Sequence, residues 1–268
     1  MFACLICYWR TAMSGCYCDG VTYSGTQTIM TEAILLGIAV LGVSTSLFLN
    51  FAPNRLIRQQ NRTPPALAAQ GALDELLGKL EHFSEQVEAS KPEREYRMLN
   101  ITRDTGEFLS AMIAATGAQK ILEIGTSNGY STLWLARALS LQGGTVTTIE
   151  HSSYKTALAA ENFRLAGLEK HIRQIQGDAG QALNQLGPQR FDLIFLDADR
   201  AAYKDLWPNI RAMLSLRGVL IIDNAVSHAH ELVDFFAVLQ ADSDFTTSLV
   251  PVGNGEMMAV RVAVTPSA

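Results

Sequence analysis

The sequence predicts an α/β protein in which helices cover both faces of a doubly wound, mostly parallel sheet of seven strands. Three observations support this. Apolar runs alternate with helical patterns from residue 120 onward, a strand leads through a glycine turn into a helix at 120–139, and two final runs flank Gly253-Asn254-Gly255. Alternation predicts parallel strands joined by helices, and a glycine-rich link predicts a hairpin. The predicted fold is therefore Rossmann-like, with a C-terminal antiparallel hairpin.

Short apolar runs predict the strands, which we place at residues 120–124, 145–150, 172–176, 191–197, 218–223, 245–250 and 257–264. Helices are expected between them, for example over 132–139, 154–166 and 203–214, and one or two more over 93–115. Apolar residues at helical spacing over 73–87 predict an amphipathic helix that ends before Pro92. We expect its apolar face to pack against the main domain or against a second subunit.

All four cysteines lie in the first eighteen residues, at Cys4, Cys7, Cys16 and Cys18. Their absence elsewhere excludes a disulfide-held core and indicates a reducing compartment. A zinc site would need a wider second pair than Cys16-x-Cys18, so a disordered tail over 1–29 is favoured. A further alternative is that residues 1–29 are upstream translation and that Met30 opens the protein.

Residues 33–54 carry no charge, and an apolar run occupies 34–52. A helix of about 20 residues spans roughly 30 Å, enough to cross a bilayer. The arginines that follow, at 55, 58 and 62, orient the downstream part toward the cytoplasm. We therefore expect a transmembrane anchor at 30–54, a linker at 55–65 and a cytoplasmic main domain at 66–268. A peripheral hydrophobic helix is the alternative, because Ser44-Thr45-Ser46 interrupts the run.

The charge balance argues against a nucleic-acid partner. The formal net charge is -5, and no stripe of lysine and arginine occurs along the chain. A polyanion would need such a basic surface. Small molecules and proteins remain as partners.

The glycine turn has the spacing G-x-x-x-G, from Gly125 to Gly129, and not the G-x-G-x-x-G of dinucleotide enzymes. Both glycines let backbone approach a ligand closely. Glu123 would repel a pyrophosphate but attract a cation, and Glu150 ends the next strand, where acids bind ribose hydroxyls. S-adenosylmethionine (SAM) carries two cationic groups and no phosphate, so it fits these acids. The alternative is a turn that only packs a helix on a strand.

Acidic and amide side chains also follow the fourth and fifth parallel strands. Asp197 comes after one strand, and Asp223-Asn224 come after the next. Ligands of open parallel sheets lie beyond the carboxyl ends of the strands. Hard oxygen ligands of this kind suit Mg²⁺ or another divalent cation. The alternative is that these residues cap the helices that follow them.

Four stretches resemble the cation-dependent small-molecule O-methyltransferases, class I SAM enzymes that include catechol and caffeoyl-CoA O-methyltransferases and bacterial relatives. The stretches are residues 122–131 (LEIGTSNGYS), 148–150 (TIE), 191–199 (FDLIFLDAD) and 218–224 (GVLIIDN). They occur in the order and spacing of that family. The similarity covers residues 100–264 and excludes residues 1–90.

The resemblance implies a role for each matching position. Residues expected to contact SAM are Glu123, Gly125, Ser127 and Ser131 at its methionine end, Glu150 at the ribose, Asp178 and Ala179 at the adenine, and Asp197 beside it. Asp197, Asp223 and Asn224 would bind the divalent ion, which holds two neighbouring acceptor oxygens and acidifies the hydroxyl. Relatives are often dimers, so a homodimer through the helix at 66–90 is a further expectation.

Arg200 departs from the family, which usually carries lysine there as the base. A guanidinium stays protonated and cannot take a proton. The metal alone is one alternative, Lys204 a second, and His228 or His230 a third, since imidazole titrates near neutral pH. For the histidines, a solvated loop position is the competing interpretation. The segment 225–228 also lacks the aromatic of many relatives, so plant and animal members do not indicate the acceptor.

We therefore expect a catalytic domain that methylates a hydroxyl of a small, vicinal-dihydroxy aromatic acceptor with SAM and a divalent metal. A membrane-tethered SAM-binding protein without such turnover is one alternative, because the family lysine is missing. A metal-independent small-molecule methyltransferase is another. A nicotinamide dehydrogenase is disfavoured by the glycine spacing.

Overall fold

The computed structural model describes residues 65–90 and 93–262. The expected tail, the membrane anchor at 34–52 and all but the last residue of the expected linker lie outside these residues, so they stay predictions. Within the described part of the chain, no helix combines the length and the apolar character that crossing a bilayer would need.

Helices and strands alternate as predicted. The helices are α2 (Pro65–Ser90), α3 (Arg103–Thr116), α4 (Tyr130–Gln142), α5 (Ser153–Ala166), α6 (Ala179–Leu186), α7 (Tyr203–Met213) and α8 (Ala229–Ala241). Short 3₁₀ helices are η1 (Arg94–Tyr96), η2 (Glu169–His171) and η3 (Arg200–Ala202). The strands are β1 (Lys120–Ile124), β2 (Thr145–Glu150), β3 (Ile172–Gln176), β4 (Phe191–Leu196), β5 (Leu214–Ile222), β6 (Phe245–Val250) and β7 (Glu256–Arg261).

The seven strands form one sheet in the order β3-β2-β1-β4-β5-β7-β6. Strands β1 to β5 run parallel, and β7 runs antiparallel to both β5 and β6. The doubly wound fold and the terminal hairpin are thereby confirmed. The strand order reverses between β1 and β4, which is where ligands bind in sheets of this kind.

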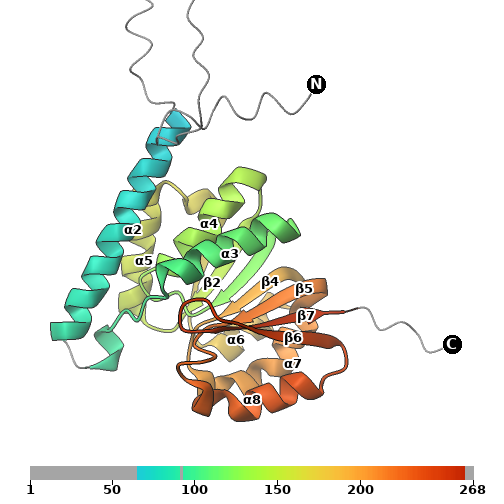
Figure 1. Ribbon diagram of the computed structural model, residues 1–268. Helices are drawn as coiled ribbons and strands as arrows, with labels where there is room; N and C mark the ends of the chain where they lie inside the picture. The colour runs from blue at the N-terminus through green and yellow to red at the C-terminus, as the bar shows by residue number, and fades with distance from the viewer. Residues whose placement is uncertain (1–64, 91–92, 263–268) are drawn as a thin grey trace, which may run out of the picture. The chain divides into compact units, whose positions relative to one another are not determined.

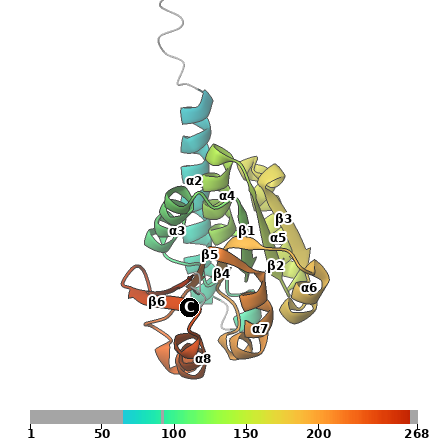
Figure 2. The same cartoon turned by 90° about the vertical axis from the view of Figure 1, so that its right-hand side faces the viewer.

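Helices cover the two faces of the sheet in separate layers (Figures 1 and 2). Helices α3, α4 and α5 lie over one face, and α6, α7 and α8 lie over the other. A buried hydrophobic cluster fills the space under each layer, one including Leu109, Leu133 and Phe163 and the other Leu183, Ile210 and Phe235. Because alternate side chains of a strand point to opposite faces, each central strand contributes to both clusters.

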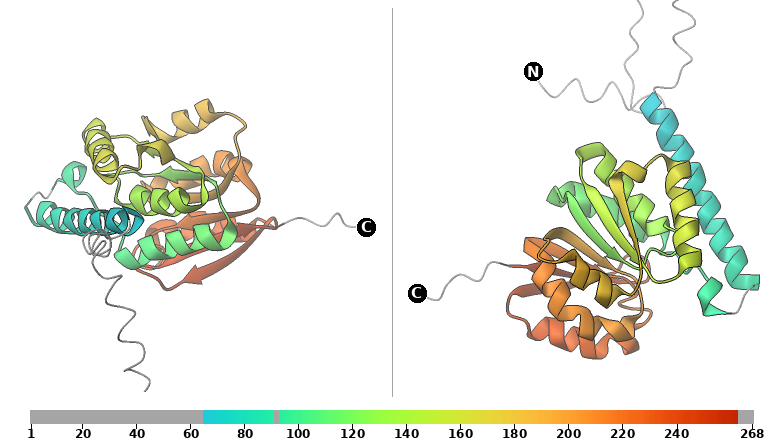
Figure 3. Two further views of the ribbon diagram at one scale, coloured as in Figure 1. Left: turned by 90° about the horizontal axis from the view of Figure 1, so that it is seen from above. Right: turned by 180° about the vertical axis from the view of Figure 1, so that it is seen from behind.

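Helix α2 packs on the outside of the α3–α5 layer, as the view from above shows (Figure 3). Leu73, Leu77 and Leu80 are buried in the cluster under that layer. The expected packing of this helix against the main domain is therefore confirmed, and its packing against a second subunit stays a prediction. Proline is tolerated in the first turn, where the missing N–H has no helical partner. Pro65 accordingly begins the helix, which corrects our placing of the residue in the linker.

Some element boundaries differ from the prediction. Strand β5 begins at Leu214, four residues before the expected 218, because Leu214 pairs with Phe191 across an irregularity in the β4–β5 register. The helical region expected at 93–115 resolves into η1 and α3, and Thr102 caps α3 by accepting a hydrogen bond from the backbone N–H of Thr105.

Candidate active site

The strand register brings the predicted site residues to one edge of the sheet. Ile124 pairs with Leu196, and Leu196 pairs with Ile222. The residues that follow these positions, Gly125, Asp197 and Asp223, therefore lie at adjacent strand ends. A cavity of about 800 Å³ opens there, a size typical of small-molecule sites.

The glycine turn forms one wall of this cavity. Gly125 has φ +107°, and a Cβ at this position would lie 1.9 Å from the carbonyl oxygen of Asp197. Only glycine permits this contact between the turn and the end of β4. Ser127 follows with φ 49°, and its backbone N–H donates to a carboxylate oxygen of Glu150 at 2.8 Å.

Glu150 lines the cavity in a fixed orientation. Its second carboxylate oxygen accepts a hydrogen bond from the backbone N–H of Ser152 at 2.8 Å. Asp178 and Ala179 line the same side, where Asp178 caps α6 by accepting from the N–H of Gln181 at 2.9 Å. Gly125, Ser127, Glu150, Asp178, Ala179 and Asp197 thus all reach the cavity.

Glu123 and Ser131 do not line the cavity, which differs from their expected placement at the ligand. Glu123 is fully buried behind the turn and accepts hydrogen bonds from the hydroxyls of Ser131, Thr132 and Thr148. Burial raises the pKa of Glu123 to about 7, although these three donors lower it. Both residues therefore lie behind the turn and support it, and neither reaches the cavity.

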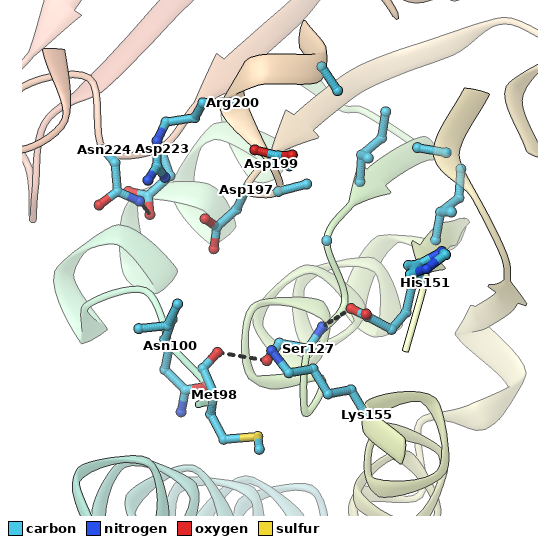
Figure 4. Close-up of a pocket in the computed structure, with 18 of the residues that line it drawn as sticks. Met98, Asn100, Ser127, His151, Lys155, Asp197, Asp199, Arg200, Asp223 and Asn224 are labelled. Atoms are coloured by element: carbon cyan, nitrogen blue, oxygen red, sulfur yellow. Dashed lines mark hydrogen bonds between the residues drawn. The ribbon is translucent and has the colours of Figure 1, made fainter. Parts of the chain in front are cut away.

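A segment from the end of η1 to α3 covers the cavity, and no pattern in the sequence points to it. The hydroxyl of Ser127 donates to the carbonyl of Met98 at 2.6 Å (Figure 4). Leu99 has φ 52°, and its N–H donates to a carboxylate oxygen of Glu88 on α2 at 3.0 Å. Met98, Leu99 and Asn100 all line the cavity. A leucine in the left-handed region carries no sequence signature, so only the structure reveals this cover.

Asp197, Asp223 and Asn224 lie on the opposite side of the cavity from Ser127 and Lys155 (Figure 4). Asn224 has φ 63°, a conformation that asparagine tolerates well, and its amide donates to Asp223 at 2.5 Å. Burial, joined by the charges of Asp223 and Glu123, raises the pKa of Asp197 well above its ordinary value. A divalent cation would relieve this repulsion, and the two carboxylates and one amide are oxygen ligands that Mg²⁺ accepts.

A further acid, Glu256 at the start of β7, lies beneath Asp223 and belongs to none of the predicted motifs. One of its oxygens accepts from the hydroxyl of Thr105 at 2.9 Å, and the residue is fully buried. Burial and the adjacent Asp223 raise the pKa of Glu256 to about 10, so it is protonated at neutral pH. Across the described residues, no group of three or more His, Cys, Asp and Glu side chains is placed to hold a metal ion. The predicted metal ligands include only two residues of these types, Asp197 and Asp223, because the third ligand is Asn224.

The three predicted catalytic residues, Lys204, Arg200 and His228, take different positions. Lys204 is exposed on α7 and does not line the cavity. Arg200 lines it, with its Nε 2.7 Å from a carboxylate oxygen of Glu231. His228 lines it too, and its Nδ1 lies 2.9 Å from the hydroxyl of Ser227, which itself donates to Asn224 at 3.0 Å. With the Ser227 proton on Asn224, the tautomer of His228 that carries its proton on Nδ1 completes this chain and leaves Nε2 as a proton acceptor.

Known proteins share both the sequence pattern and the fold. A catechol O-methyltransferase of Niastella koreensis is 34% identical over 139 residues, covering 51% of this chain and 62% of that relative. The chain thus spans less than two thirds of that relative's length. An O-methyltransferase of Bacillus cereus in complex with SAH has a TM-score of 0.60 at 28% identity, covering 71% of this chain and 90% of that one.

A second solved structure is as similar to this chain in fold as the first. An O-methyltransferase of Streptomyces achromogenes, in complex with SAM, also has a TM-score of 0.60, at 27% identity over 70% of this chain and 90% of that one. The model of the O-methyltransferase family matches residues 75–262, which include every described helix and strand except the first turns of α2. The chain therefore belongs to the O-methyltransferase family.

Proposed function

We propose that this protein transfers the methyl group of SAM to a hydroxyl of a small, vicinal-dihydroxy aromatic acceptor, with a divalent cation bound. The observation that carries the proposal is the division of one cavity into two halves. Gly125, Ser127 and Glu150 line a half that suits SAM, and Asp197, Asp223 and Asn224 line a half that suits a hard cation.

The residues of the first half fit the donor by shape and charge. The glycine turn leaves room for the donor against backbone, and Glu150 presents a carboxylate whose orientation is fixed by two backbone N–H groups. A bound donor held against the turn would meet the acceptor in a defined geometry, which is the main catalytic contribution expected of the protein.

In the second half, Asp197, Asp223 and Asn224 would hold the cation, which supplies Lewis-acid chemistry by lowering the pKa of the acceptor hydroxyl. The acceptor oxygen forms a bond to the methyl carbon, the carbon–sulfur bond breaks, and its electron pair stays on sulfur. The hydroxyl proton leaves to a base, and the imidazole of His228, which lines the cavity, takes that role in our proposal. Arg200 cannot accept that proton but contributes a fixed positive charge.

The test is product formation from labelled SAM with a panel of vicinal diols and matched monophenols, analysed by mass spectrometry. We expect methylation of the diols with Mg²⁺, its loss in EDTA, and its recovery when Mg²⁺ is returned. Asp197→Asn and His228→Asn should lower kcat strongly, whereas Lys204→Ala should not. Transfer that is unaffected by EDTA and by Asp197→Asn would contradict the metal-dependent reaction.

A further inference from the structure

Arg200 is held at the cavity by a residue from a distant helix. Glu231 lies in the first turn of α8, and its carboxylate oxygen is 2.7 Å from Nε of Arg200. The Arg200 side chain is 11% exposed, and that of Glu231 is 39% exposed. The pair therefore links two elements at this edge of the sheet. One is η3, which follows β4, and the other is α8, which follows Asp223 and Asn224 at the end of β5.

The charge of Arg200 acts on both aspartates of the cavity. Arg200, Asp197 and Asp223 line the same cavity. Burial raises the pKa of both aspartates, and the positive charge of Arg200 opposes that rise at each of them. The other titratable groups that face this pair are Tyr203, His228 and His230. Among the described residues, the two terminal nitrogens of Arg200 have no hydrogen-bond partner. They are available to a ligand in the cavity.

An arginine beside two carboxylates has a competing arrangement. Its planar fork pairs readily with a carboxylate through two parallel hydrogen bonds. Without the bond from Nε to Glu231, the guanidinium of Arg200 would be free to fold onto Asp197 or Asp223. That pairing would neutralise a carboxylate that is needed to bind the divalent ion. It would also move the positive charge of Arg200 away from the acceptor.

We propose that Glu231 is a positioning residue that keeps the Arg200 guanidinium off the aspartates and beside the acceptor hydroxyl, where its fixed charge favours the ionised form of that hydroxyl. This inference rests on the proposed function and deepens it. Arg200 thereby keeps the positive charge that lysine supplies at this position in the family, but it cannot take a proton as a lysine can. Proton removal is left to another group, and charge stabilisation is assigned to Arg200.

The experiment measures the ionisation of 4-nitrocatechol bound to the Mg²⁺-loaded protein, from its visible absorbance as a function of pH. Four proteins form a double-mutant cycle: the wild type, Glu231→Gln, Arg200→Gln and the double variant. We expect Glu231→Gln to raise the apparent pKa of the bound nitrocatechol by about one unit, a tenfold loss of ionisation. In the Arg200→Gln background, the same change should have almost no effect, because Glu231 acts only through Arg200.

A conservative variant separates charge from geometry. Arg200→Lys keeps the charge but loses the fork, so it should recover only part of the ionisation lost in Arg200→Gln. Equal effects of Glu231→Gln in both backgrounds, or no effect in either, would overturn the role of Glu231 while leaving the proposed function intact. Failure of the wild type to bind 4-nitrocatechol with Mg²⁺ would instead overturn the proposed function, and this inference with it.

Discussion

Replacing Gly125 with alanine should damage stability and donor binding together. The new Cβ would lie 1.9 Å from the carbonyl oxygen and 2.6 Å from the carbonyl carbon of Asp197. Real Cβ atoms do not approach closer than about 3.0 Å, so the ends of β1 and β4 would have to separate by about 1 Å. That movement would disturb the backbone hydrogen bonds from Gly125 to Ile149 and from Asp197 to Ile124, both 3.0 Å.

Two costs add up for this variant. A non-glycine residue at positive φ costs about 1–2 kcal/mol, and overpacking costs about 1–3 kcal/mol. The free energy of unfolding should therefore fall by about 2–5 kcal/mol, a large part of the stability of an ordinary domain. Gly117 is the matched control, because it has φ +68° and a Cβ there meets nothing within 4 Å. Gly117→Ala should lose only the conformational cost, about 1–2 kcal/mol.

Urea unfolding measures the stability of both variants, and isothermal titration with SAM measures the binding. We expect Gly125→Ala to bind SAM at least about tenfold more weakly, equivalent to about 1.4 kcal/mol, and Gly117→Ala to bind as the wild type does. The reasoning is refuted if the two variants have equal stability and bind SAM equally well.

Three further perturbations test separate parts of the structure. In the wild type, the raised pKa of Glu123, about 7, contributes stability at low pH that is lost as the pH rises through that value. Glu123→Gln should therefore reduce the fall in the free energy of unfolding between pH 5 and 8, which urea unfolding at each pH measures. Leu77→Ala should lower the free energy of unfolding by about 2–5 kcal/mol, because Leu77 is fully buried in the cluster under α2. Ser127→Ala should weaken SAM binding several-fold, about 1 kcal/mol, because the hydroxyl bond to Met98 is lost.

The changes at Glu123 and Leu77 each have a matched control variant. The exposed Glu107 serves for Glu123, and Glu107→Gln should leave the pH dependence of stability as in the wild type. Leu141 is 75% exposed, so Leu141→Ala should change the free energy of unfolding by less than about 0.5 kcal/mol. A loss of stability in Leu141→Ala equal to that in Leu77→Ala would contradict the packing of α2, and unchanged SAM affinity in Ser127→Ala would contradict the role of the segment around Met98.

The sequence was most informative where local pattern and strand register decide the structure. Parallel strands β1, β2 and β3 have the predicted bounds, and their ends are marked in the sequence by Gly125, Glu150 and Gly177. Since the carboxyl ends of neighbouring strands meet, the residues that follow them can be grouped from their positions in the chain alone. Asp197 and Asp223 reach one cavity for this reason.

The rest of the site depends on elements that approach from elsewhere. Glu231 meets Arg200 across 31 residues, and Glu256 meets Asp223 through the antiparallel pairing of β7 with β5. Neither contact has a local spacing that a sequence displays. The one available signal for Glu256 was its position as an acid directly before the predicted strand at 257–264. Glu123 illustrates the opposite case, in which a residue of the motif is placed correctly in the chain but faces three hydroxyls and not the cavity.

The central claim is that Asp197, Asp223 and Asn224 share one divalent ion beside the bound methyl donor. Titration with Mn²⁺ in the presence of SAM, followed by the electron paramagnetic resonance signal of the free ion, tests it most directly. The account predicts one site in the wild type and its loss in Asp223→Asn, with SAM still bound in both proteins. A wild type that binds no Mn²⁺, or a variant that binds it equally well, would contradict the account.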